Sequence, residues 1–187
     1  GRHKWGQRAL LARRLVEAGT SFVTMQMQDP HIPGAIGNWD IHAVNGHLFE
    51  DARARLPVYD RAIAALIEDI YDRGLDKKVM LIVSGEFGRT PRINSQKGTD
   101  SKVVQPGRDH YPGAMSVLVA GGGMQTGQVV GSTTARGEHP KDRRLDPNDL
   151  LATVYRHLGI DSQERTPDTS GRPTPLIPHG EPIAELL

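Results

Sequence analysis

The stretch Val79–Asn94, VMLIVSGEFGRTPRIN, decides the fold of this chain. Its first part, Val79 to Ser84, is a continuous apolar run, the pattern of a strand covered on both faces. The run passes directly into a polar segment that contains two glycines. Ligands of α/β proteins gather beyond the carboxyl ends of strands, so this segment is the first place to expect a site.

Further elements are predicted on both sides of this strand. Helical spacing of apolar residues, with glycine or capping signals at the ends, predicts helices over Gln7–Ala18, Leu48–Asp72 and Asp146–Leu158. Strands are predicted over Ser21–Met27, over Ala114–Ala120 and near Gln128–Gly131. Pro57 should kink or split the second helix. Ser95–Gly107 is expected to be a surface insertion.

The alternation of helices with apolar strands favours an α/β layered fold with a largely parallel sheet. A chain of 187 residues can form one domain with a real core. The Pro-rich residues 162–187 are expected to wrap the surface of that domain as a tail.

Composition excludes several classes of function. Lys and Arg number 23 against 22 Asp and Glu, so there is no electrostatic reason to expect a nucleic-acid partner. No apolar run approaches the ~18 residues of a membrane span. The absence of cysteine excludes disulfides, thiolate metal sites and a cysteine nucleophile. The chain begins GRHKWGQ, without an initiator methionine or a signal peptide, and is expected to be the interior of a longer protein.

Asp40, His42 and His110 are the candidate metal ligands. Asp40 and His42 are two residues apart, so both side chains project to one side of an extended segment. His110 could supply a third ligand, and three protein ligands with one open position are the usual arrangement of catalytic zinc. The alternative is that each histidine only makes hydrogen bonds within its own loop.

Glu86 and three arginines are the other candidates. A carboxylate at the end of an apolar strand needs a partner. Glu86 is therefore either paired with Arg89 or Arg92 or an acceptor for loop amides, or it is a metal ligand or a base. Arg89, Arg92 and Arg108 could form a fork for phosphate or sulfate, or they could lie on a solvated loop surface.

The order of these motifs resembles a known family. WDIH, a long helix, VSGEFGRTP, GRDHYPGAMSVLVAGGG and DPNDLLATVYRHLGID are similar to the sulfatase-like bacterial proteins of domain-of-unknown-function family 1501. The match extends from about Trp5 to about Ile183. That family in turn resembles the alkaline phosphatase superfamily, which includes phosphatases, sulfatases and phosphoglycerate mutases.

The resemblance implies a fold. It implies a three-layer α/β/α sandwich with a mostly parallel sheet, alkaline phosphatase-like and incomplete at its N-terminal side. Residues 1–187 would be the C-terminal part of one such domain. An upstream portion would contribute the first strand, a metal-binding aspartate and the nucleophile.

The resemblance also implies site residues. One metal site of the superfamily would use Asp40, His42 and His110, and Glu86 could ligate through oxygen. Phe87 stands where the superfamily has a ligand and has no donor atom, so the second metal site has lost a ligand. Arg89 or Arg108 would orient an anionic ester.

Two functions are therefore expected. The first is a metal-dependent hydrolase of small-molecule or glycan sulfate or phosphate esters, with zinc, calcium or manganese as cofactor. The alternative is a non-catalytic binding or structural module on the same fold. The resemblance suggests an exported protein, periplasmic or extracellular. The sequence does not determine the oligomeric state.

Overall fold

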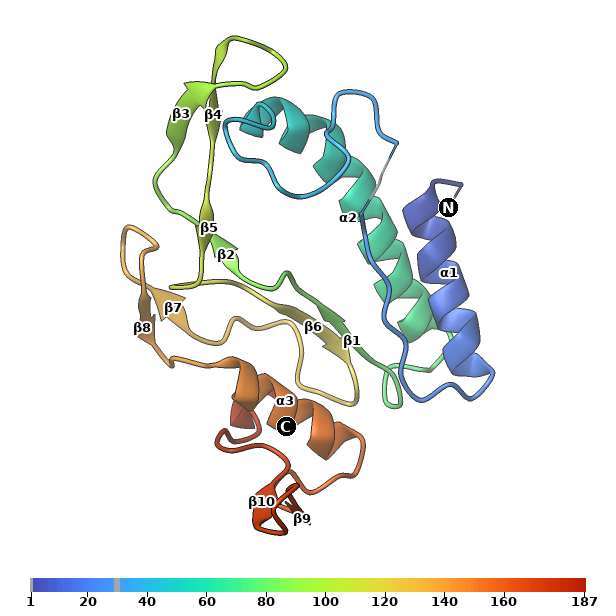
Figure 1. Cartoon of the computed structure of the whole chain (residues 1–187). Helices are drawn as coiled ribbons and strands as arrows, with labels where there is room; N and C mark the ends of the chain where they lie inside the picture. Colours follow the sequence, from blue (N-terminus) through green and yellow to red (C-terminus); the bar gives the residue numbers. More distant parts are fainter. Residues whose placement is uncertain (1, 29–30) are drawn as a thin grey trace.

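A computed structural model describes residues 2–28 and 31–187 of the chain. Within that part there are three α-helices and five short antiparallel strand pairs, with α1 and α2 together on one side of the strands (Figure 1). The helices are α1 (Lys4–Glu17), α2 (Leu48–Asp72) and α3 (Pro147–His157), with a 3-10 turn at Ala184–Leu186. The strand pairs are β1 (Met80–Val83) with β6 (Leu118–Gly121), β2 (Gly88–Arg89) with β5 (His110–Tyr111), β3 (Asn94–Lys97) with β4 (Val104–Gly107), β7 (Ser132–Thr133) with β8 (Pro140–Asp142), and β9 (Arg165–Pro167) with β10 (Pro173–Pro175).

The core lies between α1 and α2, which run side by side (Figure 1). Ala9 of α1 packs against Leu66 and Ile70 of α2, and all three are buried. Met25 and Leu81, which are partly buried, also pack against this cluster. The cluster therefore joins the helix pair to β1 and to the extended segment that follows α1.

The helix predictions are largely confirmed. The predicted bounds of α2 are those observed, and Pro57 does not split the helix. α3 begins directly after Asp146, as the capping signal in the sequence predicts. The Asp146 side chain accepts hydrogen bonds from the amides of Asn148 and Asp149. The Asp149 side chain in turn accepts from the amide of Asp146, which completes a capping box.

The predicted parallel α/β/α sandwich is wrong. β1 pairs with β6 antiparallel, with Met80 opposite Gly121 and Val83 opposite Leu118. Parallel neighbours need a crossover connection, usually a helix, and the described chain between these strands forms hairpins and loops instead. An apolar run shows that a strand is buried, but it does not show the direction of the neighbouring strand. Even the burial is partial, since all four β1 residues are half-buried.

Two further strand predictions are wrong. Val23, Met25 and Met27 of the segment Ser21–Met27 are half-buried and alternate with exposed residues, as predicted for a strand. The segment nevertheless pairs with no other strand among the described residues. Residues 128–131 also lie outside any strand, because β7 begins at Ser132.

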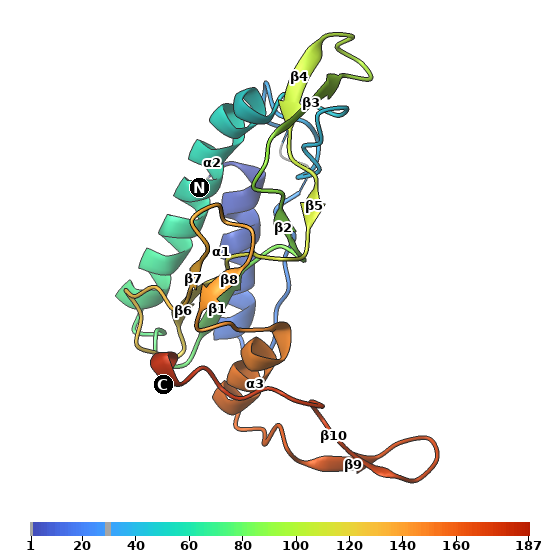
Figure 2. The same cartoon turned by 90° about the vertical axis from the view of Figure 1, so that its left-hand side faces the viewer.

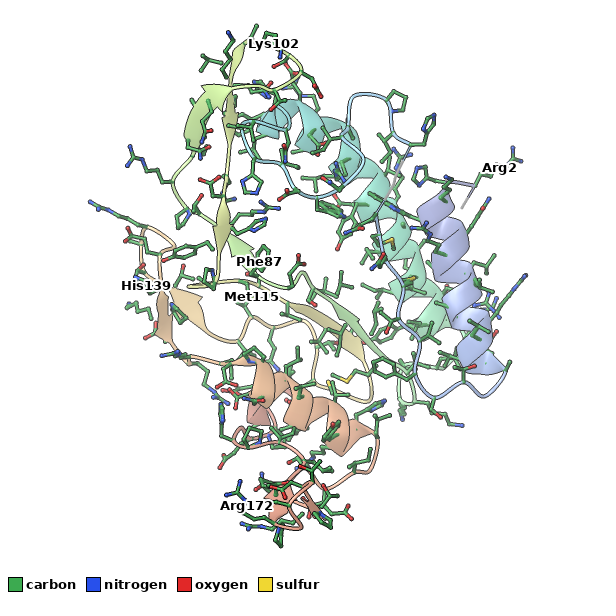
Figure 3. All side chains as sticks on the ribbon, viewed as in Figure 1. Arg2, Phe87, Lys102, Met115, His139 and Arg172 are labelled. Carbon is green, nitrogen blue, oxygen red and sulfur yellow. The ribbon has the colours of Figure 1, made fainter. Side chains whose placement is uncertain are left out.

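Two hairpins extend from the body of the molecule. The predicted insertion at Ser95–Gly107 forms most of the β3–β4 hairpin, with Lys102 at its tip (Figure 3). The β9–β10 hairpin belongs to the predicted tail and projects away from α3, as Figure 2 shows. None of the described helices is long and apolar enough to cross a membrane.

Candidate metal centre

The loop before α2 carries Asp40 and His42, and a buried ion pair fixes this loop to the helix. Arg55 and Asp51 are 0% and 2% exposed, and Arg55 Nε lies 2.7 Å from Asp51 Oδ1. Arg55 Nη2 also donates to the carbonyl of Ile36, at 2.8 Å. A buried guanidinium with several hydrogen bonds holds its partners in a defined geometry, so the loop is anchored just before its site residues.

Trp39 fixes the backbone beside Asp40. Its indole Nε1 donates to the carbonyl of Met27 at 2.7 Å. Its ring stacks on buried Trp5 at 5.9 Å between centroids and meets Tyr59 edge-on at 5.2 Å. Such aromatic contacts restrict the ring, so the residue that follows Trp39 starts from a fixed position.

A close approach of β4 to the same loop brings in His110. A Cβ at Gly107 would overlap the backbone of His42 and Ala43, so only glycine allows this contact. Next to it, the amide of Arg108 donates to the carbonyl of Ile41 at 3.3 Å. The chain then enters β5, whose first residue is His110.

Three predicted ligand atoms meet at this point. His42 Nε2 lies 2.8 Å from Asp40 Oδ1, and His110 Nε2 lies 2.7 Å from the same oxygen. The two imidazole Nε2 atoms are 3.2 Å apart. The side chains of Asp40 and His110 are 40% and 48% exposed, which leaves the cluster open to solvent. The structure thus brings Asp40, His42 and His110 together, as the sequence predicts.

The other nitrogen of His42 is held by a carboxylate. Asp109 Oδ1 lies 2.8 Å from His42 Nδ1, and Asp109 Oδ2 accepts a hydrogen bond from Asn94 Nδ2 at 2.6 Å. A carboxylate behind a histidine fixes its tautomer and ring orientation, which is the usual arrangement behind metal-ligating histidines. Asp109 and Asn94 are therefore positioning residues for His42.

These contacts create a conflict between acceptors. When Nδ1–H of neutral His42 donates a hydrogen bond to Asp109, Nε2 carries a lone pair and faces the oxygen of Asp40. Two acceptors at 2.8 Å repel each other unless a proton or a cation lies between them. The cluster is therefore arranged for positive charge.

The charge of Asp40 agrees with this arrangement. Partial burial raises the pKa of the Asp40 carboxyl, but the hydrogen bond with His110 and the electrostatic interactions with His42 and Arg89 lower this pKa by more. The net effect places the pKa below the ordinary aspartate value, so Asp40 is ionised at neutral pH.

Arg89 and Arg108 make contacts within the loops. Arg89 Nη2 donates to the carbonyl of Trp39 at 2.7 Å and lies 3.3 Å from Asp40 Oδ1. Arg108 donates through Nη2 to the carbonyl of Arg89 at 3.0 Å, and through Nε to the carbonyl of Thr90. Both guanidinium groups therefore connect the loops that carry the ligands.

Glu86 and Phe87 precede β2. Glu86 is exposed, and its carboxylate forms no hydrogen bond or ion pair with any described residue, so the partners Arg89 and Arg92 are not used. Phe87 packs against His110, with ring centroids 4.3 Å apart, at the junction of β2 with the chain from β1 (Figure 3). It covers part of the His110 ring.

Sequence reasoning missed Asp109 and Asn94. Asp109 directly precedes His110, and a carboxylate next to a candidate ligand is the signal that could have found it. Asn94 carries no such signal, because its role depends on the pairing of β3 with β4, which places it opposite Gly107.

The fold and the cluster define a mixed helix and strand domain with a surface Asp–His–His site. The whole chain, residues 1–187, matches the family described as "Protein of unknown function (DUF1501)", and it belongs to that family. The comparisons with curated proteins and with solved structures gave no match.

The expected relationship to sulfatases and to the alkaline phosphatase superfamily is corrected by these findings. The matching family is described only as a family of unknown function, and no comparison shows such a relationship. The antiparallel pairing of β1 with β6 also differs from the parallel sheet that the relationship implied. Any activity must therefore be argued from the site itself.

Proposed function

We propose that the chain binds one divalent cation through Asp40, His42 and His110. The observation that carries this proposal is the convergence of one carboxylate oxygen and two imidazole Nε2 atoms, all within 3.2 Å of one another. A cation between these atoms would remove the conflict between the acceptors. Asp109 would hold His42 in the tautomer that presents Nε2 to the ion.

The donor set indicates which cations fit. Two imidazole nitrogens and one carboxylate oxygen suit zinc, and they also suit manganese. Calcium prefers six to eight oxygen ligands, so this set suits it least. The exposed side of the cluster leaves room for a further ligand, which is the property that separates a catalytic site from a closed structural one.

The activity we propose is hydrolysis of a phosphate or sulfate ester. A bound cation would act as a Lewis acid toward an oxygen of the ester. Arg89 also contacts Asp40, with Nη2 at 3.3 Å from Oδ1. Glu86 is exposed and unpaired among the described residues, so its carboxylate is free to accept a proton.

Phe87 favours a second candidate, a non-catalytic binding module. Its ring covers part of His110 at 4.3 Å and brings an apolar surface against a ligand. The hydroxyl of Thr90 is also not free to act as a nucleophile, because it donates a hydrogen bond to the carbonyl of Arg92 and accepts one from the amide of Asp109. In this candidate the cation and the loops would bind an anion without cleaving it.

Metal analysis tests the shared part of both candidates. The purified chain is incubated with zinc, manganese or calcium, dialysed, and measured by elemental mass spectrometry. We expect one zinc or manganese ion per chain, and loss of that ion in Asp40→Ala and His110→Ala. Asp100→Ala is the matched control, since Asp100 is an exposed carboxylate outside the cluster. Absence of metal in the unchanged protein would contradict both candidates.

An ester panel separates the two candidates. The metal-loaded protein is assayed with aryl phosphate and aryl sulfate esters, beside Glu86→Gln and Asp40→Ala. Hydrolysis that Asp40→Ala abolishes and Glu86→Gln slows supports the hydrolase. Stoichiometric metal without hydrolysis of any ester supports the binding module.

A further inference from the structure

A second polar site lies at the other end of β1. A cavity of about 920 Å³ opens between the C-terminal end of α1, the turn before β1 and the C-terminal end of α3. Ligand pockets usually have volumes of about 300–1,000 Å³, so this cavity could hold a small organic molecule. It shares no residue with the metal cluster, which lies beyond the carboxyl end of β1.

The cavity is lined by an excess of positive charge. Lys77 and Lys78 line the cavity from the turn before β1. Arg156 and His157 line it from α3. Among the described residues, no carboxylate forms an ion pair with Lys77, Lys78 or Arg156, and none of the three donates a side-chain hydrogen bond. Cations gathered around one cavity without counter-charges favour an anionic ligand.

The one acidic residue in the lining does not offset this charge. Glu17 is paired with Arg13 and lies 3.5 Å from Arg73, and both arginines also contact Asp69. These four residues form a group that is neutral in itself. The charges of Lys77, Lys78 and Arg156 are therefore left uncompensated.

Ordinary structural roles explain only part of this cluster. Arg156 and His157 lie in the last turn of α3, where positive charge interacts favourably with the helix dipole. Lys77 and Lys78 lie after α2 has ended and belong to no helix. The dipole of α3 thus explains why positive side chains lie at the end of α3. It does not explain why the two lysines line the same cavity.

Apolar side chains line much of the remaining wall of the cavity. They include Val16 on α1, Leu75 and Val79 before β1, and Leu158 after α3, together with Met124, Leu186 and Leu187. Gly122 also lines the cavity, and because it has no side chain the backbone there can lie close to His157. A ligand that fills this space therefore needs an anionic group and an apolar body.

We propose that this cavity binds an organic phosphate monoester. Its dianionic phosphate would contact Lys77, Lys78 and Arg156, and its apolar group would lie against Val16, Leu75 and Leu158. Lysine and arginine are the usual cationic partners of phosphate, and two or three of them at one point match the charge of a phosphate dianion. The site stands independently of the function proposed for the metal centre.

The test uses phenyl phosphate as the probe. Binding is measured by isothermal titration calorimetry on the Asp40→Ala chain in the presence of a chelator, so that the metal centre cannot contribute. We expect binding that weakens as salt is raised, because exposed charges are screened. We expect neutral phenol not to bind, and inorganic phosphate to bind more weakly than phenyl phosphate.

Charge reversal provides the decisive comparison. Lys77→Glu with Lys78→Glu should weaken phenyl phosphate binding at least about tenfold, since it replaces two attractive charges with repulsive ones. The matched control is Lys97→Glu with Lys141→Glu, which makes the same change of net charge on exposed strands elsewhere. Circular dichroism checks that both variants fold.

Three outcomes would overturn the proposal. One is that phenyl phosphate does not bind at millimolar concentration. Another is that both double variants weaken binding equally, which would show a general effect of net charge. The third is that inorganic phosphate binds as tightly as phenyl phosphate, which would show that an apolar group of the ligand contributes nothing to binding.

Discussion

The ring of His42 is held at both nitrogens, and these two contacts fix the geometry of the candidate metal centre. Nδ1 lies 2.8 Å from Asp109, and Nε2 lies 2.8 Å from Asp40. Asp109 is held in turn by Asn94. The position of one imidazole thus depends on β3, on the start of β5 and on the loop before α2, which are distant in sequence.

Replacing Asp109 tests this dependence at the residue scale. Asp109→Asn keeps the size of the side chain but removes the charge that fixes the tautomer of His42. We expect zinc affinity to fall about 10–100-fold, the usual effect of losing a carboxylate behind a ligating histidine. Competition with a chromophoric chelator measures the affinity. Asp100→Asn serves as the control, and equal affinities in the two variants would contradict the positioning role.

The sequence predicts the candidate ligands of this site better than the residues that position them. Asp40 and His42 share one side of an extended segment, so a local rule places these two side chains together. His110 is a candidate by residue type alone, because its contact with Asp40 joins residues 70 positions apart. The contact of Asp109 with His42 joins residues 67 positions apart, and no local rule predicts it. The contacts of Arg89 and Arg108 with backbone carbonyls depend on tertiary packing in the same way.

At the scale of elements, α3 shows what an N-terminal cap contributes. The carboxylate of Asp146 accepts hydrogen bonds from the amides of Asn148 and Asp149 and lies 3.3 Å from His179. The bond from the Asn148 amide is the main reason why the pKa of Asp146 lies below the ordinary aspartate value. The folded state therefore favours the ionised carboxylate.

This shift predicts how stability depends on pH. A lowered pKa in the folded state gives a stabilisation that is complete above the ordinary aspartate pKa and disappears as pH falls below it. We expect Asp146→Ala to lower the urea midpoint of unfolding clearly at about pH 6. At about pH 3 the difference between the midpoints of the unchanged protein and the variant should be smaller. Circular dichroism follows the transition. A gap that widens toward low pH would contradict the capping role of the ionised carboxylate.

The same scale shows why strands were harder to predict than helices. The ends and apolar stripe of α2 are local signals, and its predicted bounds are those observed. The partner and direction of a strand depend on distant residues, so the apolar run before Ser84 left the pairing of β1 open. The alternation in Ser21–Met27 likewise gave the extended form but not a neighbour.

At the scale of the whole molecule, the chain exposes more surface than its mass suggests. Its accessible surface is 12,320 Å², whereas a compact monomer of 20.5 kDa exposes about 8,900 Å². The β3–β4 and β9–β10 hairpins account for part of the excess, because they extend from the body at opposite ends (Figures 1 and 2). Large apolar side chains such as Val104 and Val129 are 71% and 92% exposed.

This surface predicts an extended shape in solution. A compact domain of 187 residues has a radius of gyration of about 16 Å, and the two projecting hairpins should raise the measured value above it. Small-angle X-ray scattering over a concentration series gives the radius, and light scattering on the same samples gives the mass of the particle. The mass is needed because exposed apolar side chains favour association, and association also increases the radius.

The hairpin contribution can be isolated by shortening one arm. Replacing residues 166–174, which include most of β9 and β10, with a short glycine and serine linker should lower the radius of the monomer and leave metal binding unchanged, because this hairpin and the cluster share no contact among the described residues. A monomer with a radius of about 16 Å before shortening would mean that the hairpins fold back onto the body. A monomer whose radius is larger and falls on shortening would confirm that the β9–β10 hairpin extends into solvent.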